Sequence, residues 1–475
     1  MPGLHLITSN RLENLVDRLA NRMREDPLPV FEPETIVVQS KGMQQWLNLQ
    51  IAQRNRISAH IHFPFPKAFV NGVFETLGND CVEDRYAPEV LTWKIMSVLP
   101  DFLEKPEFEQ VRHYCGDVAN ALKLYQLSEK IGQLFDYYLI HRPDWINQWD
   151  NGKNALKSSI EGSQWQSELW QAITEQERSE GRLTHAAEWH RRLLASDGAL
   201  DGFPRRISVF GLSTLPPFYL DVFRVLSRHI SVFLYYLNPC REFWEYCYSE
   251  KETQRFLSAG LSEADQYYES GHPLLASMGV SGREFFSLML TVLEDTGEQA
   301  FYDPPCDSML HILQSDILNL TERSSADRVQ IADEDRSIQI HSCHSPTREV
   351  EVLHDNLLAL FDSDPELKPS DMVVMMPDVS VYAPLIRAVF DAQESNIPSI
   401  PYSITDVSLN SVSSVSETFL MLLDLSTRRF RASEVLDILE NEAVRESVSV
   451  TEEELQRIAA WVRESGIRWG IDGDY

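Results

Sequence analysis

A strand pattern that turns directly into a helix pattern, in residues 32–47, constrains the fold of this chain more than any other feature. Residues 35–39 (TIVVQ) are rich in β-branched side chains, as a buried parallel strand is. Ser40 follows in the position of a helix N-cap. The apolar residues near and after it are Met43, Trp46, Leu47 and Ile51. Their steps of three and four predict an amphipathic helix, so the stretch indicates the strand-to-helix turn at which open α/β sheets bind ligands.

The same alternation of strand and helix recurs along the chain. Strands are expected at residues 3–8, 207–212, 230–237, 337–342 and 371–376. Helices are expected at residues 12–23, 345–361 and 381–390, and after Pro216 and Pro217. Short strands that alternate with helices predict parallel sheets with right-handed crossovers. A polar stretch at about 321–336 separates two such groups, which predicts two α/β domains.

Two long segments have an almost wholly helical pattern instead. Residues 67–190 contain successive amphipathic runs, such as LKLYQLSEKIGQLFDYYLIHRPDW, and predict an all-α insertion within the first α/β domain. The sequence FPFP at 63–66 marks a loop before it, because proline extends neither a helix nor a central strand. Residues from about 412 onward are helical again.

Length and composition limit the class of protein. A chain of 475 residues is too long for one hydrophobic core, so two or more domains are expected. Six cysteines without a CxxC pair are typical of a reducing compartment. The sequence has no signal-peptide pattern and no apolar run long enough to cross a bilayer, so we expect a cytoplasmic location and no membrane partner. The net charge of −30 argues against a general nucleic-acid coat, but a narrow basic channel is compatible with it.

The sequence lacks the residues that nucleotide hydrolysis requires. Residues 3–23 have the strand–helix order of a nucleotide-binding unit, but no GxxxxGK[ST] motif occurs there or elsewhere. Without this motif, few backbone N–H groups can wrap a triphosphate, and no Lys or Ser/Thr neutralises it or holds Mg²⁺. Gly211 and Leu212 stand where an acidic pair for Mg²⁺ is expected. We therefore expect no ATP hydrolysis by this chain.

Other candidate catalytic or metal-binding groups are weak. His341, Cys343 and His344 cannot converge easily, because neighbouring side chains of a strand point to opposite faces. Arg348 opens a helix, and without a phosphate loop a structural ion pair is its favoured role. No Ser-His-Asp or paired-carboxylate constellation is recognisable. We therefore expect no catalytic residue, no metal site and no cofactor in this chain.

Several segments spread along the chain carry a family resemblance. They are SNRLENL (9–15), VVQSKGMQQWL (37–47), FPFPKAF (63–69), LFDYYLIHRPDW (134–145), GLSTLPPFYL (211–220), HPLLASMG (272–279), LQSDILNL (313–320), CHSPTREVEVLHDNLL (343–358) and RESGIRWGID (463–472). The sequence resembles the RecC subunit (gamma chain) of bacterial exodeoxyribonuclease V, the RecBCD helicase–nuclease. Because members of that family are more than twice as long, the resemblance implies the N-terminal portion of such a subunit.

The resemblance implies an α/β fold. It consists of two degenerate P-loop NTPase domains of the superfamily-1 helicase type, with parallel sheets and large all-α insertions. The expected domains are residues 1–66 with 200–330 (first helicase-like domain), 67–199 (all-α insertion), 336–408 (second helicase-like domain) and 409–475 (start of a truncated helical subdomain). The absence of a phosphate loop agrees with the ATPase motifs that this family has lost.

The resemblance also implies a function without catalysis in this chain. The subunit it resembles guides the 3′ single strand of DNA to a nuclease and scans it for a Chi sequence, during double-strand break repair and homologous recombination. RecB-like and RecD-like motor subunits are the implied partners, and ATP and Mg²⁺ are expected there. Two alternatives stay open: a helicase–nuclease subunit with its own ATPase or nuclease, and a scaffold that contacts no DNA.

The Chi-contacting positions of the family carry over one at a time. Gln39, Gln45, Leu134, Asp136 and Arg142 keep the family residue. Lys41 stands in place of Thr, Phe65 in place of Leu, Asn71 in place of Trp, Gln133 in place of Asp, and Ala186 in place of Arg. Because several base-reading positions differ, the identity of the recognised sequence stays open.

The chemistry of these residues suits an unpaired strand. Gln39 and Gln45 carry amides that both donate and accept hydrogen bonds, and Phe65 offers a surface for base stacking. Arg142 can hold a phosphate or a guanine edge. Asp136 can accept a hydrogen bond from a cytosine amino group or orient Arg142.

Several of these residues also have an ordinary structural interpretation. A Gln at a helix N-terminus is usually solvated, and Trp46 is expected to belong to the core rather than to a stacking platform. Leu134 lies at helical spacing and is expected to be core in part. Arg142, Pro143 and Asp144 can form a simple helix stop.

Overall fold

The structure is a computed structural model, and it falls into two compact units. It describes residues 2–78, 85–116, 121–153, 164–179, 202–258, 271–292, 297–323, 328–392, 399–405, 414–425 and 428–470. Unit 1 is Met1–Ile338 and unit 2 is Gln339–Tyr475.

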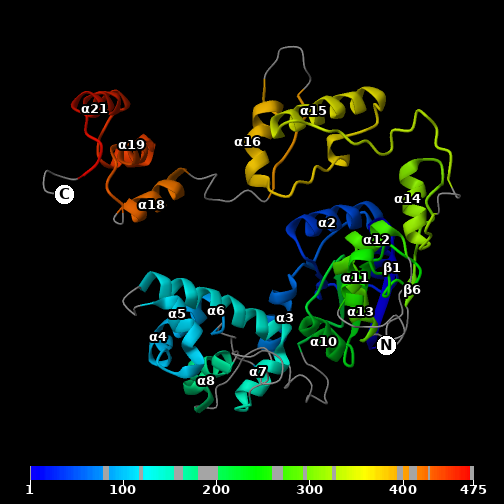
Figure 1. Cartoon of the computed structure of the whole chain (residues 1–475). Helices are drawn as coiled ribbons and strands as arrows, with labels where there is room; N and C mark the ends of the chain where they lie inside the picture. Colours follow the sequence, from blue (N-terminus) through cyan, green and yellow to red (C-terminus); the bar gives the residue numbers. More distant parts are fainter. Residues whose placement is uncertain are drawn as a thin grey trace. The chain divides into compact units, whose positions relative to one another are not determined.

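Unit 1 is built on a six-stranded sheet with the strand order β3-β2-β4-β5-β1-β6 (Figure 1). The strands are β1 (Gly3–Ser9), β2 (Glu34–Val37), β3 (Ile61–His62), β4 (Arg206–Phe210), β5 (Ser231–Leu237) and β6 (Glu298–Gln299). All neighbouring pairs are parallel, so the carboxyl ends of the strands lie at one edge. The four longer strands and their parallel pairing confirm the prediction. β3 and β6 have two residues each and were not predicted, because such short strands carry no pattern.

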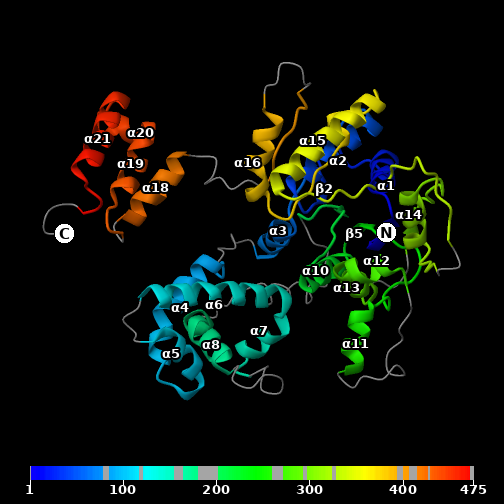
Figure 2. The ribbon, with the colours of Figure 1, turned by 45° about the horizontal axis from the view of Figure 1, so that its top comes forward.

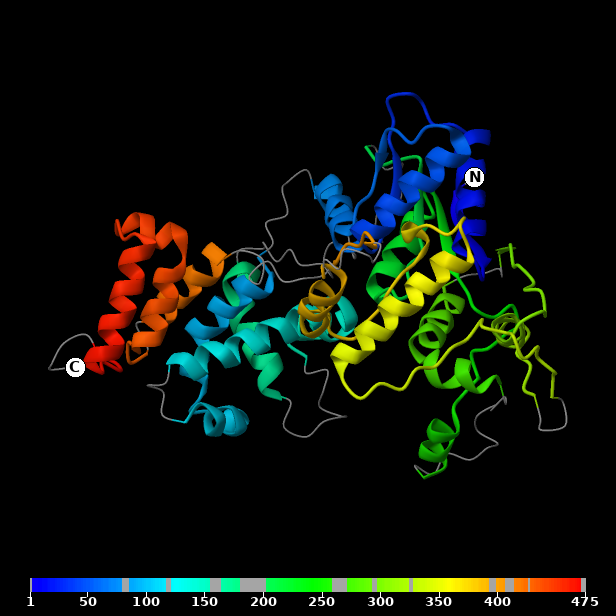
Figure 3. The ribbon, with the colours of Figure 1, turned by 90° about the horizontal axis from the view of Figure 1, so that it is seen from above.

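Helices cover both faces of this sheet. α1 (Leu12–Glu25) and α2 (Lys41–Asn55) pack on one face and contact each other (blue in Figure 3). α3 (Pro66–Gly78), α10 (Pro217–Leu226) and α13 (Val280–Leu290) pack on the other face. Alternate residues of β5 point to opposite faces, so Phe233 lies with α1 and α2 while Leu234 lies with α10. A parallel sheet covered on both faces accounts for the nearly continuous apolar runs of its strands.

The helix that follows β2 forms as its sequence predicts. The backbone N–H of Met43 donates to Oγ of Ser40 at 3.1 Å, which makes Ser40 the N-cap of α2. Leu47 and Ile51 are fully buried against the sheet. Trp46 is half-buried, with its ring 6.4 Å from that of Phe210, so the core interpretation of Trp46 is confirmed.

A helical insertion lies between β3 and β4. It contains α4 (Pro88–Phe102), η1 (Pro106–Phe108), α5 (Glu109–Cys115), α6 (Ala121–His141), α7 (Pro143–Asp150) and α8 (Gln164–Ser179), which are coloured from light blue to green in Figure 1. These helices have a core of their own, in which Phe135, Trp149 and Trp170 are fully buried. The C-terminal end of α6 contacts a different core. Its Ile140 packs against the hydrophobic core on the face of the sheet that α10 covers. α3 also belongs to that core, through Phe69 and neighbouring apolar residues.

The described residues contain further helices in each unit. Unit 1 also contains α11 (Glu250–Ser258), α12 (Pro273–Met278) and α14 (Met309–Leu318). In unit 2, α15 (Pro346–Ser363) and α16 (Val379–Phe390) pack through Val350, Ile386 and Phe390 (Figure 2). Unit 2 also contains η2 (Pro369–Asp371), α18 (Ser414–Leu425), α19 (Ala432–Glu440), α20 (Glu442–Ser447) and α21 (Glu452–Ser465). The helices predicted after residues 345 and 381 are confirmed.

The two strands predicted at residues 337–342 and 371–376 are wrong. Neither segment pairs with another strand, and among the described residues of unit 2 only one isolated bridge, between Arg431 and Trp469, has strand pairing. A strand is stable only when neighbouring backbone groups satisfy its N–H and C=O groups, and no described segment supplies them here. Ile340 is accordingly 94% exposed and Met375 is 88% exposed. The second parallel sheet therefore does not form among the described residues.

No helix in the described ranges is both long enough and apolar enough to cross a membrane.

A buried ion pair ties together the amino ends of two strands. Arg206, at the start of β4, donates from Nε and Nη2 to the two carboxylate oxygens of Glu34, each at 2.8 Å. Glu34 is the first residue of β2, and the side chains of Glu34 and Arg206 are 7% and 4% exposed. Arg206 also donates to the backbone oxygen of Asp26 at 2.6 Å. The two parallel hydrogen bonds of this bidentate pair offset the free-energy cost of removing both charges from water.

Replacing Arg206 by Ala should destabilise unit 1 strongly. The change leaves the Glu34 carboxylate buried without its partner, so the free energy of unfolding should fall by about 3 kcal/mol. Urea unfolding followed by tryptophan fluorescence measures this loss. The control is Arg18→Ala, which removes an ion pair to Glu298 whose side chains are 46% and 44% exposed, and which should cost less than about 1 kcal/mol. Equal losses in the two variants would contradict the burial argument.

Candidate nucleic-acid interface

Two predicted site residues lie at the carboxyl edge of the sheet. Gln39 follows β2 and Phe65 follows β3, and β2 and β3 are neighbours. The backbone N–H of Val38 donates to the carbonyl of Pro64 at 3.1 Å, which holds the two strand ends together. Gln39 is exposed, and Phe65 is 39% exposed. The structure therefore places an amide and an aromatic ring at the position where open α/β sheets bind ligands.

The end of β4 contributes a third group to this edge. Ser213 Oγ donates to Oε1 of Gln39 at 3.4 Å. The turn that leads to Ser213 begins at Gly211, which has a positive φ of 62°. A Cβ at Gly211 would lie 3.2 Å from Cε of Met43, on α2. Glycine thus allows both the left-handed backbone and the close approach of α2 to the end of β4.

Two further predicted residues lie on α2. Lys41 and Gln45 are four residues apart, so they share one face of the helix, and both are exposed. That face points away from the buried Leu47 and Ile51. Their amide and ammonium groups are accessible to a ligand at the N-terminal end of α2.

A salt bridge connects α3 to α6 and links the two halves of the predicted site. Nζ of Lys67 lies 3.7 Å from Oδ1 of Asp136, and the two side chains are 48% and 27% exposed. Asn71 follows Lys67 by four residues and shares its face of α3. The structure thus places Lys67 and Asn71 on one face of α3, with Lys67 joined to Asp136 of α6. Lys67 was missed by sequence reasoning, although its position one turn before Asn71 was a usable signal.

The other predicted residues lie along α6 and at its end. Gln133 is exposed, and its Oε1 accepts a hydrogen bond from Nζ of Lys130 at 3.2 Å. Leu134 is half-buried, in line with the expectation that it is core in part. Arg142 lies between α6 and α7, so the helix-stop interpretation is confirmed. Its guanidinium lies 5.6 Å from the ring of Trp145. Ala186 lies outside the described residues.

An aromatic pair that the sequence did not identify lies among these residues. Tyr137 and His141 stack with ring centroids 4.0 Å apart and an interplanar angle of 17°. Tyr137 is 52% exposed and follows Gln133 by one helical turn. Burial, and then the charge of Arg142, lower the pKa of His141, which keeps its ring neutral at pH 7. Neutral stacked rings with an open face are suitable for contact with a nucleobase.

The turn between β1 and α1, where a phosphate loop would lie, is closed by the chain itself. Asn10 donates from Nδ2 to the carbonyl of Tyr302 and accepts from its N–H, both at 2.8 Å. Ser9 Oγ donates to the carbonyl of Ala300 at 2.7 Å. The guanidinium of Arg11 lies 3.6 Å from the centroid of the Tyr302 ring. The polar groups of this turn are therefore engaged by residues 300–302.

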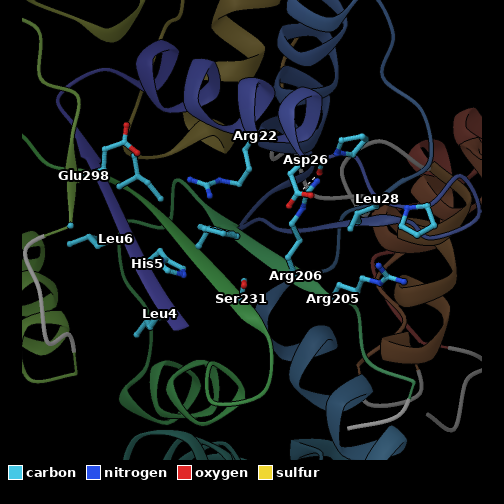
Figure 4. A pocket seen from close by; sticks show the side chains of 15 residues that line it. Leu4, His5, Leu6, Arg22, Asp26, Leu28, Arg205, Arg206, Ser231 and Glu298 are labelled. Carbon is cyan, nitrogen blue, oxygen red and sulfur yellow. Dashed lines mark hydrogen bonds and ion pairs between the residues drawn. The ribbon is translucent and has the colours of Figure 1, made fainter. Parts of the chain in front are cut away.

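A cavity of about 540 Å³ lies at the opposite, amino edge of the sheet (Figure 4). Arg22 lies over the ring of Phe233 at 3.7 Å and donates to the Tyr235 hydroxyl. Arg205 and Arg206, also in its wall, form ion pairs with acidic residues of β2 and the loop before it. Because these charges are largely compensated and none of the predicted site residues lines it, the cavity is separate from the candidate interface.

The described residues contain no group of three His, Cys, Asp or Glu side chains placed to hold a metal ion. Arg348 forms an ion pair with Glu351 at 2.9 Å, as expected of a structural role at the start of α15.

Comparison with known proteins assigns the chain to a family. The fold and the interface define an α/β protein with a parallel sheet, a helical insertion and a polar carboxyl edge. Two family models match it: "RecC, N-terminal domain" over residues 4–320, and "RecBCD enzyme subunit RecC fourth domain" over residues 412–475. The chain therefore belongs to the RecC family.

Curated relatives support the same assignment. The chain is 38% identical to the RecBCD enzyme subunit RecC of Escherichia coli (strain K12), over 99% of the chain and 45% of that protein. It is 34% identical to RecC of Haemophilus influenzae, over 98% of the chain and 46% of that protein. It is 30% identical to RecC of Mycolicibacterium smegmatis, over all of the chain and 43% of that protein. The chain thus spans a little under half the length of these relatives.

Replacing Gly211 by Ala should destabilise unit 1. The left-handed backbone costs an alanine about 1–2 kcal/mol, and the new methyl also meets Met43. Gly152→Ala is a matched control, because Gly152 has a φ of 72° and no atom within 4 Å of the added Cβ. Thermal unfolding of both variants compares the two sites. The melting temperature should fall by at least as much in Gly211→Ala as in Gly152→Ala. An unchanged melting temperature of Gly211→Ala would contradict this account.

Proposed function

We propose that this chain is the strand-guiding part of a RecBCD-type helicase–nuclease and has no catalytic site of its own. In this role it channels the 3′ single strand of DNA past the carboxyl edge of the sheet and α6, and recognises a Chi-like sequence. The function serves double-strand break repair and homologous recombination. Membership in the RecC family motivates the proposal, and the Lys67–Asp136 salt bridge between α3 and α6 supports it.

The observation that carries the proposal is the link between the sheet edge and α6. Gln39 and Phe65 lie at the ends of adjacent strands, and the Lys67–Asp136 salt bridge connects α3 to the helix that bears Gln133. Exposed amides, an accessible ring and basic side chains are what base readout of an unpaired strand requires. A folded duplex-binding groove would instead need a broad basic surface, which the net charge of −30 disfavours.

The closed turn between β1 and α1 supports a role without nucleotide hydrolysis. Phosphate binding there needs free backbone N–H groups and a lysine. Asn10 and Arg11 are engaged by Tyr302 instead, and the sequence has no phosphate-loop motif. ATP and Mg²⁺ then act in partner subunits, which are RecB-like and RecD-like motors. A cytoplasmic location is part of the same proposal.

Two rival functions make different predictions. A subunit with its own ATPase would hydrolyse ATP as the isolated chain. A scaffold that only joins the motor subunits would bind them but would not retain single-stranded DNA at low salt. The polar side chains exposed along α2, α3 and α6 favour DNA contact over a pure scaffold, because a protein–protein interface core is depleted in charged residues.

Substitutions in the candidate interface should weaken DNA binding without unfolding the chain. Gln45→Ala and Arg142→Ala each remove an exposed side chain, and lost recognition contacts cost about 1–3 kcal/mol each. The dissociation constant for a fluorescent single strand, measured by anisotropy at low salt, should rise about fivefold to a hundredfold. Gln456→Ala and Arg463→Ala change the same residue types at exposed positions of α21 and serve as controls. Equal affinities of all four variants would overturn the interface.

A further inference from the structure

Trp93 is an exposed tryptophan in the helical insertion. Three other tryptophans, Trp149, Trp170 and Trp244, are fully buried, whereas Trp93 is 62% exposed. Its neighbours Leu91 and Ile95 on α4 are buried in the insertion core. The indole therefore points outward from a helix that has an inward apolar face of its own. One exposed aromatic residue is normal on a protein surface, whereas a contiguous exposed apolar patch marks an interaction site.

Trp93 forms a platform together with Tyr125 of α6. The two rings have centroids 5.6 Å apart and an interplanar angle of 51°. Leu122 lies three residues before Tyr125, on the same face of α6, and is 65% exposed. Val90, three residues before Trp93 on α4, is 39% exposed. Two helices that pack against each other thus present an exposed apolar surface with two aromatic rings.

The platform lies on the same stripe of α6 as two residues of the candidate interface. Tyr125, Glu129, Gln133 and Asp136 follow one another at steps of three and four. Such steps place side chains on one face of a helix. Tyr125 and Gln133 are eight residues apart, which corresponds to about 12 Å along the helix axis. A strand held at Gln133 can therefore continue along α6 to Trp93.

We propose that Trp93 and Tyr125 form a base-stacking step that extends the single-strand track beyond Gln133. This inference rests on the proposed function and adds a contact that the family resemblance did not supply. Every nucleobase has a π face, so an indole accepts any base, and such a platform holds the strand without reading its sequence. The occupant is single-stranded DNA rather than a second protein, because the platform continues a face that carries the amide of Gln133.

The charges of α6 predict how DNA binding at the Trp93–Tyr125 platform should depend on salt concentration. Lys123 and Lys130 equal Glu129 and Asp136 in number, so α6 as a whole carries no net formal charge. Binding to the platform therefore depends on stacking rather than on release of counterions from phosphate. The contribution of Trp93 to affinity should be the same at low and moderate salt, whereas phosphate contacts weaken as salt rises.

The test measures the affinity of the full chain for fluorescent oligo(dT). Trp93→Ala should raise the dissociation constant by about fivefold to a hundredfold, because stacking of a base on an aromatic ring is lost. Trp93→Phe keeps a ring and should retain most of the affinity. The control is Trp461→Ala on α21, since Trp461 is 63% exposed, almost the same as Trp93. The ratio between Trp93→Ala and the unmodified chain should not change between 50 and 200 mM salt, the range over which phosphate contacts weaken by orders of magnitude.

Each other outcome overturns the inference. In one such outcome, Trp93→Ala binds oligo(dT) as tightly as Trp461→Ala does, while Arg142→Ala binds it weakly. That result would refute stacking on Trp93 and leave the proposed function intact. If Trp93→Ala binds DNA normally but no longer assembles with the motor subunits, the platform is a protein interface. If the unmodified chain binds no oligo(dT) at low salt, both the proposed function and this step fail. Far-ultraviolet circular dichroism of each variant confirms that the fold is kept.

Discussion

A parallel sheet has to be covered on both faces, and this requirement organises unit 1. α1 and α2 bury one face of the strands, while α3 and α10 bury the other. Because both faces are buried, polar side chains of the sheet reach solvent at the ends of the strands. At the amino edge the bidentate pair of Arg206 and Glu34 compensates the buried charges. At the carboxyl edge Gln39 is exposed. The two edges thus differ in chemistry, and the candidate interface lies at the second.

The turn between β1 and α1 also lies at the carboxyl edge, and it is filled by the chain itself. Asn10 holds Tyr302 against this turn through two hydrogen bonds. The adjacent strand ends stay open, and the Lys67–Asp136 salt bridge extends this region onto α6. The exposed polar groups of the candidate interface therefore lie at the ends of β2 and β3 and on α6, not in the turn between β1 and α1.

The sequence predicted the elements whose own residues carry the signal. The apolar runs of β1, β2, β4 and β5 form strands, and Ser40 caps α2, as expected. The strands expected at residues 337–342 and 371–376 failed, because a strand also needs a neighbour that local pattern cannot supply. β3 and β6 were missed because each has only two residues.

The site was predictable to a similar extent. Gln39 could be placed at the carboxyl edge because it ends a predicted strand, whereas Phe65 follows β3, which was not predicted. Two contacts could not be foreseen: Asn10 with Tyr302, and Lys67 with Asp136. They join residues far apart in the chain, and no spacing rule connects them. Mapping of photocrosslinks from a thiothymidine-bearing single strand to the full chain tests the central claim most directly. Crosslinked peptides should come from residues 39–45, 65–71 and 133–142. Crosslinks confined to unit 2 or to the amino edge of the sheet would contradict it.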